Sequence, residues 1–377
     1  MKVDFYKHSL SEKNLKHFTK ILKSDIITSG PIGEQVEKKI ANFLNVKNVI
    51  LTSSWTTGAI ITLLALKLKK NDEVILPSMT FAATANVVEI LGAKPVFVDI
   101  EKDTLLSSYN QIIKKINKKT KVIMPVHLYG NMFDTKKLKI FIKKKKLKIH
   151  IIEDSAHSLE SSIQGYKSGK WSTAAIFSFY ATKNITCGEG GAIATNDNKL
   201  AFKLRKLKSF GLSQTALEKY TSKKYNEVDM YDFGINGKLP DLLSFLLLPQ
   251  IKSLNQNLLK RKKIYNNYIS LLKNVDVFVP KIPKNCVSAF HIFVVGVENK
   301  KRNKIVNHFK KKKIGCSIHY KPIHQLTYFK KKYKLNDKTF PNASRWGAEC
   351  ITLPFHLKLT YKQQYYVIKV LKKLLIN

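Results

Sequence analysis

Short apolar runs alternate with amphipathic stretches through the first 250 residues of the chain. The runs are rich in β-branched residues and are apolar on both faces, as expected of parallel strands buried under helices. We therefore predict strands at Asn48–Thr52, Glu73–Pro77, Pro95–Asp99, Lys121–Pro125, His150–Asp154, Ala174–Phe179 and Gly191–Thr195.

Between these runs, apolar residues recur at helical spacing. The segments are Thr57–Lys69, Ala82–Leu91, Tyr109–Ile116, Thr135–Lys145 and Lys199–Phe210. Alternation of strands and helices predicts an α/β domain, in which helices flank a mostly parallel, seven-stranded sheet. Ligands of such sheets bind at the carboxyl ends of the strands, so chemistry is expected in the loops there.

The pattern changes after Pro249, and 377 residues exceed what one hydrophobic core usually supports. We expect a large domain at residues 1–250 and a smaller α+β domain at residues 251–377. The smaller domain should contain helices and strands in the order Gln250–Leu272 (helix), Phe290–Val297 (strand), Lys300–Lys312 (helix), Gly315–Tyr320 (strand) and Tyr361–Leu375 (helix).

The formal charge of +41 would suit a protein that binds nucleic acid. However, only four basic residues are arginine, the residue favoured for reading bases and gripping phosphates. The lysine content is high throughout the chain and the lysines form no pattern, so we expect no nucleic-acid partner. A positive field suits an anionic small substrate equally well. A non-catalytic, nucleic-acid-binding regulator is kept as an alternative.

The cysteines and apolar stretches indicate a cytoplasmic protein. The four cysteines show no paired spacing, which argues against a disulfide framework or a cysteine-based zinc site, and we expect no metal. No apolar stretch approaches the ~20 residues of a membrane span. Residues 1–14 are mixed in charge and lack the apolar core of a signal peptide.

The first chemical motif is Lys183, which follows the Ala174–Phe179 run and precedes the turn Gly188–Gly191. Burial of a lysine lowers its pKa and frees its amine as a nucleophile. Glycines in the turn permit a close approach of a ligand to the backbone. A surface lysine beside a tight turn would give the same short pattern.

The second motif is Asp154, at the end of an apolar run, with His157 three residues later. A carboxylate there can hold the proton on a pyridine nitrogen, which makes a pyridoxal cofactor an electron sink. His157 could support Asp154 or donate to the phenolic oxygen of the same ring. Alternatively, Asp154 simply caps the next helix.

Two further motifs also follow strands. The hydroxyl-rich turn Thr52–Gly58 precedes a helix, whose N-terminus is suited to phosphate, although a plain capping turn looks the same. In Pro77–Thr84, Phe81 could stack on a flat ring or belong to the core. All four motifs end strands of one predicted sheet and could converge at one edge.

These motifs resemble, in their order, spacing and residue identity, those of the nucleotide-sugar aminotransferases of the DegT/DnrJ type. The resemblance runs from about Thr28 to the C-terminus and is carried by Val74–Asn86, Leu91–Asp99, Pro125–Gly130, Ile152–His157 and Phe177–Asn184. It implies the fold of type I enzymes that depend on pyridoxal 5′-phosphate (PLP). Ser53–Gly58 and Lys183–Gly191 look most like the branch that makes UDP-4-amino-4-deoxy-L-arabinose for lipid A modification.

The resemblance implies a role for each motif residue. Lys183 would hold PLP as a Schiff base, and Asp154 would pair with the pyridine nitrogen. His157, where many relatives have Gln, would approach the ring oxygen, and Phe81 would stack on the ring.

For the phosphate, the resemblance implies contacts from Trp55, Thr56 and Ser178. Trp55 stands where relatives usually have glycine, so either its backbone alone makes the contact or the phosphate cup is remodelled. Family members are homodimers with shared active sites, and Asn236 would reach the partner's phosphate. Glu189, His319 and His324 would border the substrate.

The implied reaction is a transamination. L-Glutamate would give its amino group to a nucleotide-linked keto sugar, with C4 of a UDP-linked 4-keto sugar favoured, for lipopolysaccharide or another surface polysaccharide. A PLP-dependent sugar dehydratase is the runner-up, but the Schiff-base lysine is typically histidine in those relatives. Lys183 therefore favours amination.

Overall fold

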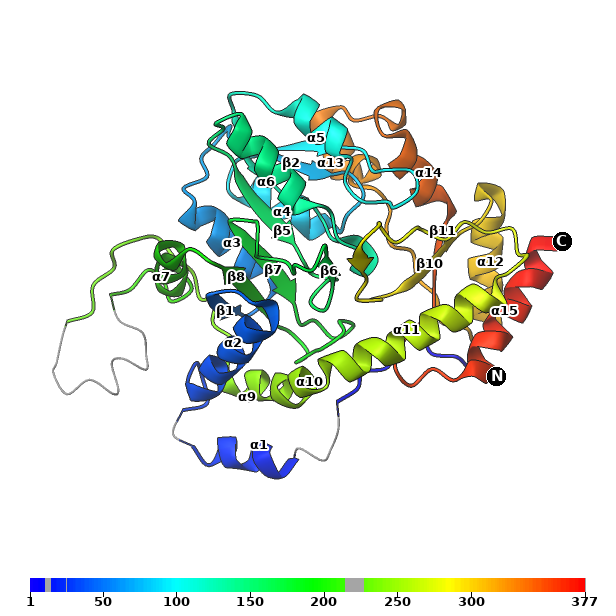
Figure 1. Cartoon of the computed structure of the whole chain (residues 1–377), viewed down its shortest axis with the longest axis horizontal. Coiled ribbons are helices and arrows are strands. Elements are labelled where there is room, and N and C mark those ends of the chain that lie inside the picture. Colours follow the sequence, from blue (N-terminus) through cyan, green and yellow to red (C-terminus); the bar gives the residue numbers. More distant parts are fainter. Residues whose placement is uncertain (11–14, 25, 214–226, 377) are drawn as a thin grey trace.

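A seven-stranded sheet forms the centre of the computed structural model, which describes residues 1–10, 15–24, 26–213 and 227–376 (Figure 1). The strand order is β1-β8-β7-β5-β4-β2-β3. The strands are β1 (Asn48–Thr52), β2 (Glu73–Pro77), β3 (Lys94–Val98), β4 (Thr120–Ile123), β5 (His150–Asp154), β7 (Ala174–Ser178) and β8 (Gly191–Thr195). All the runs predicted as strands in the first 250 residues are strands, and the mostly parallel sheet is confirmed.

One strand of this sheet runs against the others. β8 pairs antiparallel with both β1 and β7, whereas the remaining pairs are parallel. The segment between β7 and β8, residues 179–190, contains no helix that could carry a parallel crossover. The beginning of β8 therefore lies at the edge where the other strands end, and the turn before Gly191 faces the same space as Asp154 and Ser178.

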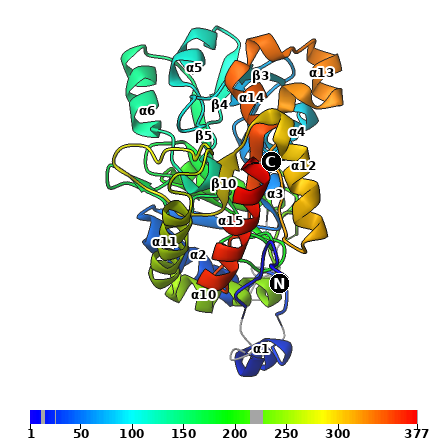
Figure 2. The ribbon, with the colours of Figure 1, turned by 90° about the vertical axis from the view of Figure 1, so that its right-hand side faces the viewer.

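Helices flank the sheet on both sides (Figures 1 and 2). Those of the first 250 residues are α1 (Leu15–Leu22), α2 (Pro31–Leu44), α3 (Trp55–Ala65), α4 (Ala82–Ile90), α5 (Tyr109–Lys115), α6 (Thr135–Lys144), α7 (Asn198–Leu207), α9 (Asp241–Ser244) and α10 (Leu248–Lys252). The five predicted helices are present with shifted ends. For example, α3 begins at Trp55 rather than Thr57, because the hydroxyl of Ser54 accepts from the Thr57 amide and caps the helix.

The later residues form the helices α11 (Leu254–Leu271), α12 (Asn299–Lys311), α13 (Thr327–Tyr333), α14 (Pro341–Glu349) and α15 (Tyr361–Ile376). The short strands are β6 (Ser162–Ile163), β9 (Cys286–Val287), β10 (Phe293–Gly296) and β11 (Cys350–Leu353). Single 3-10 turns are η2 (Leu128–Gly130), η3 (Phe245–Leu247), η4 (Ile323–Gln325) and η5 (Asp337–Thr339).

The strand predicted at Gly315–Tyr320 is wrong. Within this segment only Ser317 makes a bridge, to Thr352, and Ile314 just before it bridges Val3. The two bridges are single and have different partners, so no continuous ladder forms at this segment. The prediction of one helix at Gln250–Leu272 also needs correction, since α10 and α11 separate at Ser253.

One hydrophobic core packs against the central sheet, with Ile50, Val122 and Ile193 among its buried residues. A second hydrophobic core lies among α11, α12, α15 and the β10-β11 pair, and Figure 2 shows α15 between α11 and α12. Tyr268, Phe293 and Phe309 are buried there. Val3 is buried in the same core, so the first residues pack against the C-terminal part of the chain. The domain division at residue 250 stays a prediction.

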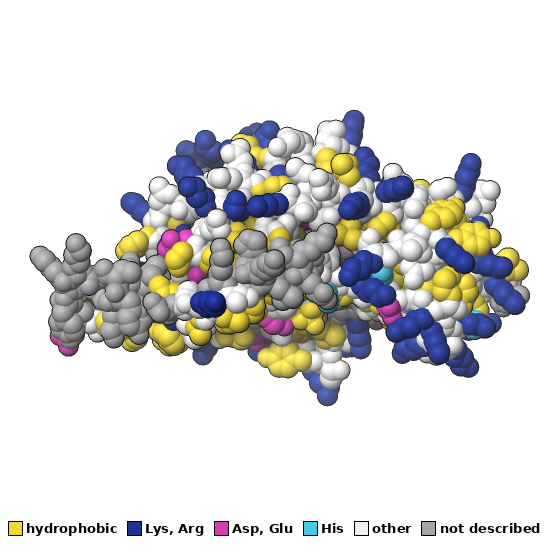
Figure 3. Space-filling model, turned by 90° about the horizontal axis from the view of Figure 1, so that it is seen from below, with side chains coloured by type: hydrophobic (Ala, Val, Ile, Leu, Met, Phe, Trp, Pro, Cys, Tyr) yellow, Lys and Arg dark blue, Asp and Glu magenta, His cyan; other side chains and the backbone are white. Residues whose placement is uncertain are grey.

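The surface carries the charge expected from the composition. Lys and Arg side chains are spread over the face shown in Figure 3 and do not gather in one patch. Within the described ranges, none of the helices combines the length and the apolar character that crossing a bilayer requires.

The packing at the start of β8 generates a stability prediction. A Cβ on Gly191 would lie 2.5 Å from the backbone carbon of Ser54, whereas a Cβ on Gly190 would meet the end of the Cys187 side chain at 2.6 Å. Because backbone cannot move aside as a side chain can, we expect Gly191→Ala to lower the free energy of unfolding by about 2 kcal/mol. Gly190→Ala, the matched control, should cost less in urea denaturation. Equal losses would contradict this account of the turn.

Candidate active site

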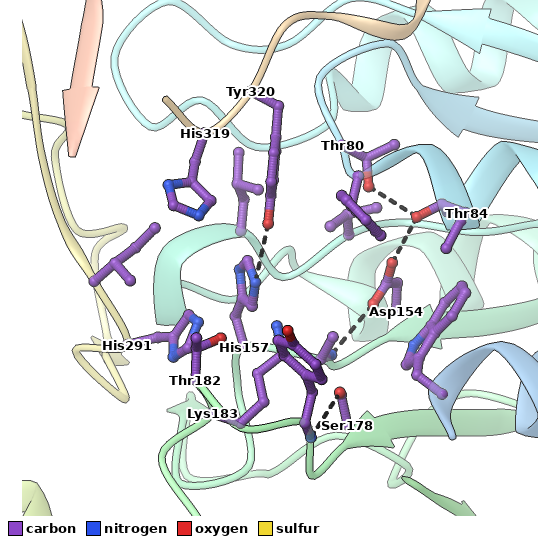
Figure 4. A pocket seen from close by; sticks show the side chains of 18 of the residues that line it. Thr80, Thr84, Asp154, His157, Ser178, Thr182, Lys183, His291, His319 and Tyr320 are labelled. Carbon is purple, nitrogen blue, oxygen red and sulfur yellow. Dashed lines mark hydrogen bonds between the residues drawn. The ribbon is translucent and has the colours of Figure 1, made fainter. Parts of the chain in front are cut away.

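A cavity of about 550 Å³ opens where the strands β2, β5 and β7 end and α3 begins (Figure 4). It collects residues from both cores of the molecule. Its lining includes Trp55, Thr56, Phe81, Asp154, His157, Ser178, Lys183, Glu189 and His319. The four motifs predicted to converge at one sheet edge do so.

Lys183 lies in the segment that connects β7 to β8 and reaches into this cavity. Its amide donates to the Tyr180 carbonyl at 2.9 Å, which fixes the turn that presents the side chain. Burial lowers the pKa of Lys183 to about 8, while the charge of Asp154 acts in the opposite direction. About a tenth of the amine is therefore unprotonated at pH 7, far more than at the ordinary lysine pKa of 10.5.

Asp154 ends β5, and its carboxylate is held in one orientation. Oδ2 accepts from the Thr84 hydroxyl at 2.9 Å, and Oδ1 accepts from the Ala156 amide at 3.2 Å. Thr80 lies 2.9 Å from Thr84 and extends the network, as Figure 4 shows. Burial raises the pKa of Asp154 above its ordinary value, although these hydrogen bonds oppose the rise. A buried carboxylate held in one orientation is suited to bind a cationic group of a ligand.

His157 stands beside Lys183 in a cluster of rings. It stacks on His291 with centroids 4.2 Å apart, and Tyr320 places its hydroxyl 3.3 Å from Nε2. Burial, and then the charge of Lys183, hold the pKa of His157 well below its usual range. Nδ1 accepts from the Tyr129 amide at 3.3 Å, so the proton of the neutral ring is on Nε2.

The part of the cavity that is lined by the start of α3 and the end of β7 is suited to an anion. Trp55 and Thr56 form the first residues of α3, whose leading N–H groups have no acceptor within the helix. Ser178, at the end of β7, adds a hydroxyl to the wall. The Trp55 side chain is almost buried, and its indole nitrogen has no hydrogen-bond partner among the described residues. A helix N-terminus of this kind binds phosphate groups.

The outer wall combines aromatic and polar side chains. Phe81 is 60% exposed and lies 5.7 Å from Tyr320, centroid to centroid. His319 is fixed through Nδ1, which is 2.7 Å from the Thr352 hydroxyl. Glu189 enters from the turn before β8. A flat ligand could therefore lie against Phe81 with the lysine at its edge.

Two predicted site residues do not line the cavity. His324 is buried, and its ring nitrogens contact Ser78 at 2.5 Å on one side and Ser344 at 2.8 Å and Asp337 at 3.1 Å on the other. Both nitrogens already have protein partners, so we do not carry His324 forward as a substrate contact. Asn236 pairs with Ser209 outside the cavity, and its expected role in a partner's site stays a prediction.

Several lining residues were not singled out by sequence reasoning, namely Tyr6, Thr80, Thr84, Tyr320 and His291. Thr84 closes a motif that had already been recognised, and Tyr320 is next to His319. Tyr6, which lies near the start of the sequence, donates a hydrogen bond from its hydroxyl to the Ala181 carbonyl. Tyr6 and His291 lie in segments without any motif, so only the fold reveals their position.

The residues present fit PLP. An amine of lowered pKa, a fixed carboxylate, an exposed aromatic face and a helix N-terminus with hydroxyls surround one cavity. These are the groups that a pyridine aldehyde with a phosphate tail requires.

Comparisons with known proteins agree with this geometry. The profile of the DegT/DnrJ/EryC1/StrS aminotransferase family matches residues 8–372. A UDP-4-amino-4-deoxy-L-arabinose–oxoglutarate aminotransferase of Shewanella sediminis is 30% identical, over 98% of this chain and 97% of that protein.

Two solved structures have the same fold. One is Spr1654 of Streptococcus pneumoniae in its PMP form, a protein assigned as a sugar aminotransferase, with a TM-score of 0.93, 28% identity and 99% of each chain covered. The other is Helicobacter pylori PseC, an aminotransferase of pseudoaminic acid biosynthesis, with a TM-score of 0.91, 26% identity and 100% of each chain covered.

The chain therefore belongs to the DegT/DnrJ/EryC1/StrS aminotransferase family. Aminotransferases of this family depend on PLP, so the predictions of fold type, enzyme class and cofactor are confirmed.

The lowered pKa of Lys183 can be measured directly. In the cofactor-free protein, modification of Lys183 by an amine-selective reagent should titrate with a midpoint at about pH 8. Asp154→Asn should move the midpoint lower, because the Asp154 carboxylate stabilises the protonated amine. Peptide mapping by mass spectrometry gives the rate at this lysine alone. A midpoint at the ordinary value of 10.5 would contradict the burial argument.

Proposed function

We propose that this protein transfers an amino group from L-glutamate to C4 of a UDP-linked keto sugar, in the cytoplasm, for a surface polysaccharide or glycolipid. The carrying observation is that Lys183 and Asp154 line one cavity, close enough for the Asp154 charge to act on the amine, beside a helix N-terminus suited to phosphate. The names of the Shewanella sediminis enzyme and of PseC support a sugar substrate.

We assign the cofactor contacts from the same walls. Trp55, Thr56 and Ser178 would hold the phosphate, and Phe81 would cover one ring face. Asp154 would pair with the ring nitrogen. His157 would donate Nε2–H to the phenolic oxygen, a donor that suits an oxygen carrying negative charge. When bound, PLP supplies an aldehyde that joins amines and a ring that withdraws electrons.

Lys183 is the residue that moves the proton. With the cofactor bound, its Nζ would accept the proton from Cα of glutamate and pass it to the cofactor. In the second half of the cycle Nζ would take a proton from the cofactor and give it to the sugar carbon that receives the nitrogen. The pKa of about 8 leaves the amine able to do both near neutral pH. Asp154 keeps its partner nitrogen protonated throughout.

We also propose a homodimer in which Asn236 contacts the phosphate of the partner's site. Asn236 belongs to a segment outside its own cavity. Nearby apolar side chains are exposed on the described surface, including Phe210, Tyr231 and Phe233. Clustered exposed aromatic residues are typical of a surface that a partner covers.

Substrate incubation tests the function. The PLP-loaded protein should aminate at least one UDP-linked 4-keto sugar with L-glutamate as donor, seen as a mass change, and 3-keto and dTDP- or GDP-linked sugars should react more slowly. Lys183→Ala should abolish the reaction, because the only proposed proton carrier is lost. A panel in which no keto sugar is aminated would refute the substrate class.

Mixing two variants tests the shared site. Lys183→Ala should be inactive and Asn236→Ala should bind PLP weakly, yet a hybrid dimer would regain one site with both residues intact. After subunit exchange at limiting PLP, we expect about a quarter of wild-type activity, since half the dimers are hybrids with one good site. Activity that stays at the sum of the separate variants would exclude Asn236 from the partner's site.

A further inference from the structure

His291 is a cavity residue to which the proposed mechanism gives no role. It lies between β9 and β10, in the part of the chain that leads into the second core. The residue is 6% exposed and its ring stacks on His157, and Figure 4 shows it on the side of the site away from Asp154. A buried imidazole on a cavity wall presents either a hydrogen-bond donor or an acceptor, depending on its tautomer.

Asn184, directly after Lys183, fixes that tautomer. Its side-chain nitrogen is 3.0 Å from Glu160 Oε2 and 3.1 Å from the Ala289 carbonyl. Glu160 is paired with the Arg261 guanidinium, which also donates to the Ala289 carbonyl. The carboxylate and the carbonyl can only accept, so the atom facing them must be the amide nitrogen. The amide oxygen of Asn184 therefore faces His291.

His291 Nδ1 lies 3.0 Å from this oxygen and must donate its proton to it. Burial, and then the charge of Lys183, hold the pKa of His291 well below its usual range, so the ring is neutral and has one proton. Nε2 is left as an acceptor. Among the residues that the structure describes, none hydrogen-bonds to it. The stacked rings of His157 and His291 thus have opposite tautomers.

We propose that His291 is a specificity-determining residue whose Nε2 accepts a hydrogen bond from a hydroxyl of the sugar, with Asn184 as the positioning residue that sets the tautomer. This inference rests on the proposed function. A sugar hydroxyl can donate to Nε2, whereas a carboxylate of glutamate only accepts and is disfavoured beside a neutral acceptor. His291 therefore favours the sugar in the second half of the cycle.

Nitrogen NMR of the holoenzyme with labelled histidine tests the tautomer. Wild-type His291, assigned by the signal lost in His291→Asn, should carry its proton on Nδ1. Asn184→Leu removes the accepting oxygen at similar size and should shift the proton towards Nε2. A wild-type ring with its proton on Nε2, or a tautomer unchanged in Asn184→Leu, would overturn the role of Asn184.

Two substitutions of His291 test the acceptor itself. His291→Asn can still donate to Asn184 but has no atom at the Nε2 position, whereas His291→Gln reaches that position with a carbonyl oxygen. We expect His291→Asn to raise KM for the aminated UDP-linked keto sugar about tenfold, and His291→Gln to raise it less. KM for glutamate should change less than twofold in both variants, by about the precision of the assay.

Equal rises for both substrates, or for both variants, would refute a selective acceptor. A wild-type protein that aminates no sugar would instead refute the proposed function. It would also refute the sugar hydroxyl as the hydrogen-bond donor to His291 Nε2. The tautomer measurement would still decide whether Asn184 controls His291, so the two failures are distinguishable.

Discussion

The site depends on one constraint, which is that an amine must lie where water is scarce and a single carboxylate, that of Asp154, acts on its charge among the described residues. Lys183 meets this constraint because the strand before it and the reversed strand after it enclose the turn that bears it. Asp154 is close enough to influence the charge of the amine but is itself bound by Thr84 and by the Ala156 amide. The amine is therefore neither fully neutralised nor locked in an ion pair, and it stays available for exchange of covalent partners.

Much of the sheet and part of the site could be predicted from the sequence, because both leave local signals. Buried parallel strands are apolar on both faces, and the chemical motifs stand directly after them. The ends of α3 and the gap at Ser253 could not be placed by periodicity, since capping and kinks depend on single contacts. The Gly315–Tyr320 run looked like a strand, but its neighbours in space are two unrelated segments.

The rest of the site depends on contacts between segments that are far apart in the chain. His291 lines the cavity beside Asn184, which contacts Glu160 and the Ala289 carbonyl, and Arg261 bridges the same two groups. His324 had the right neighbours in sequence, yet the fold turns it towards Ser78. Local spacing cannot distinguish these two histidines, because it carries no information on which face of the chain meets the cavity.

The first ten residues have a consequence for how this enzyme is handled. Val3 is buried beside Ile314 in the second core, and Tyr6 hydrogen-bonds to Ala181, two positions before Lys183. The amino-terminal segment thus connects the second core, through Val3, to the turn that bears Lys183, through Tyr6. A change that displaces residues 3–6 would therefore disturb both the second core and the turn that bears Lys183, whereas α15 packs in the second core and lines none of the cavity.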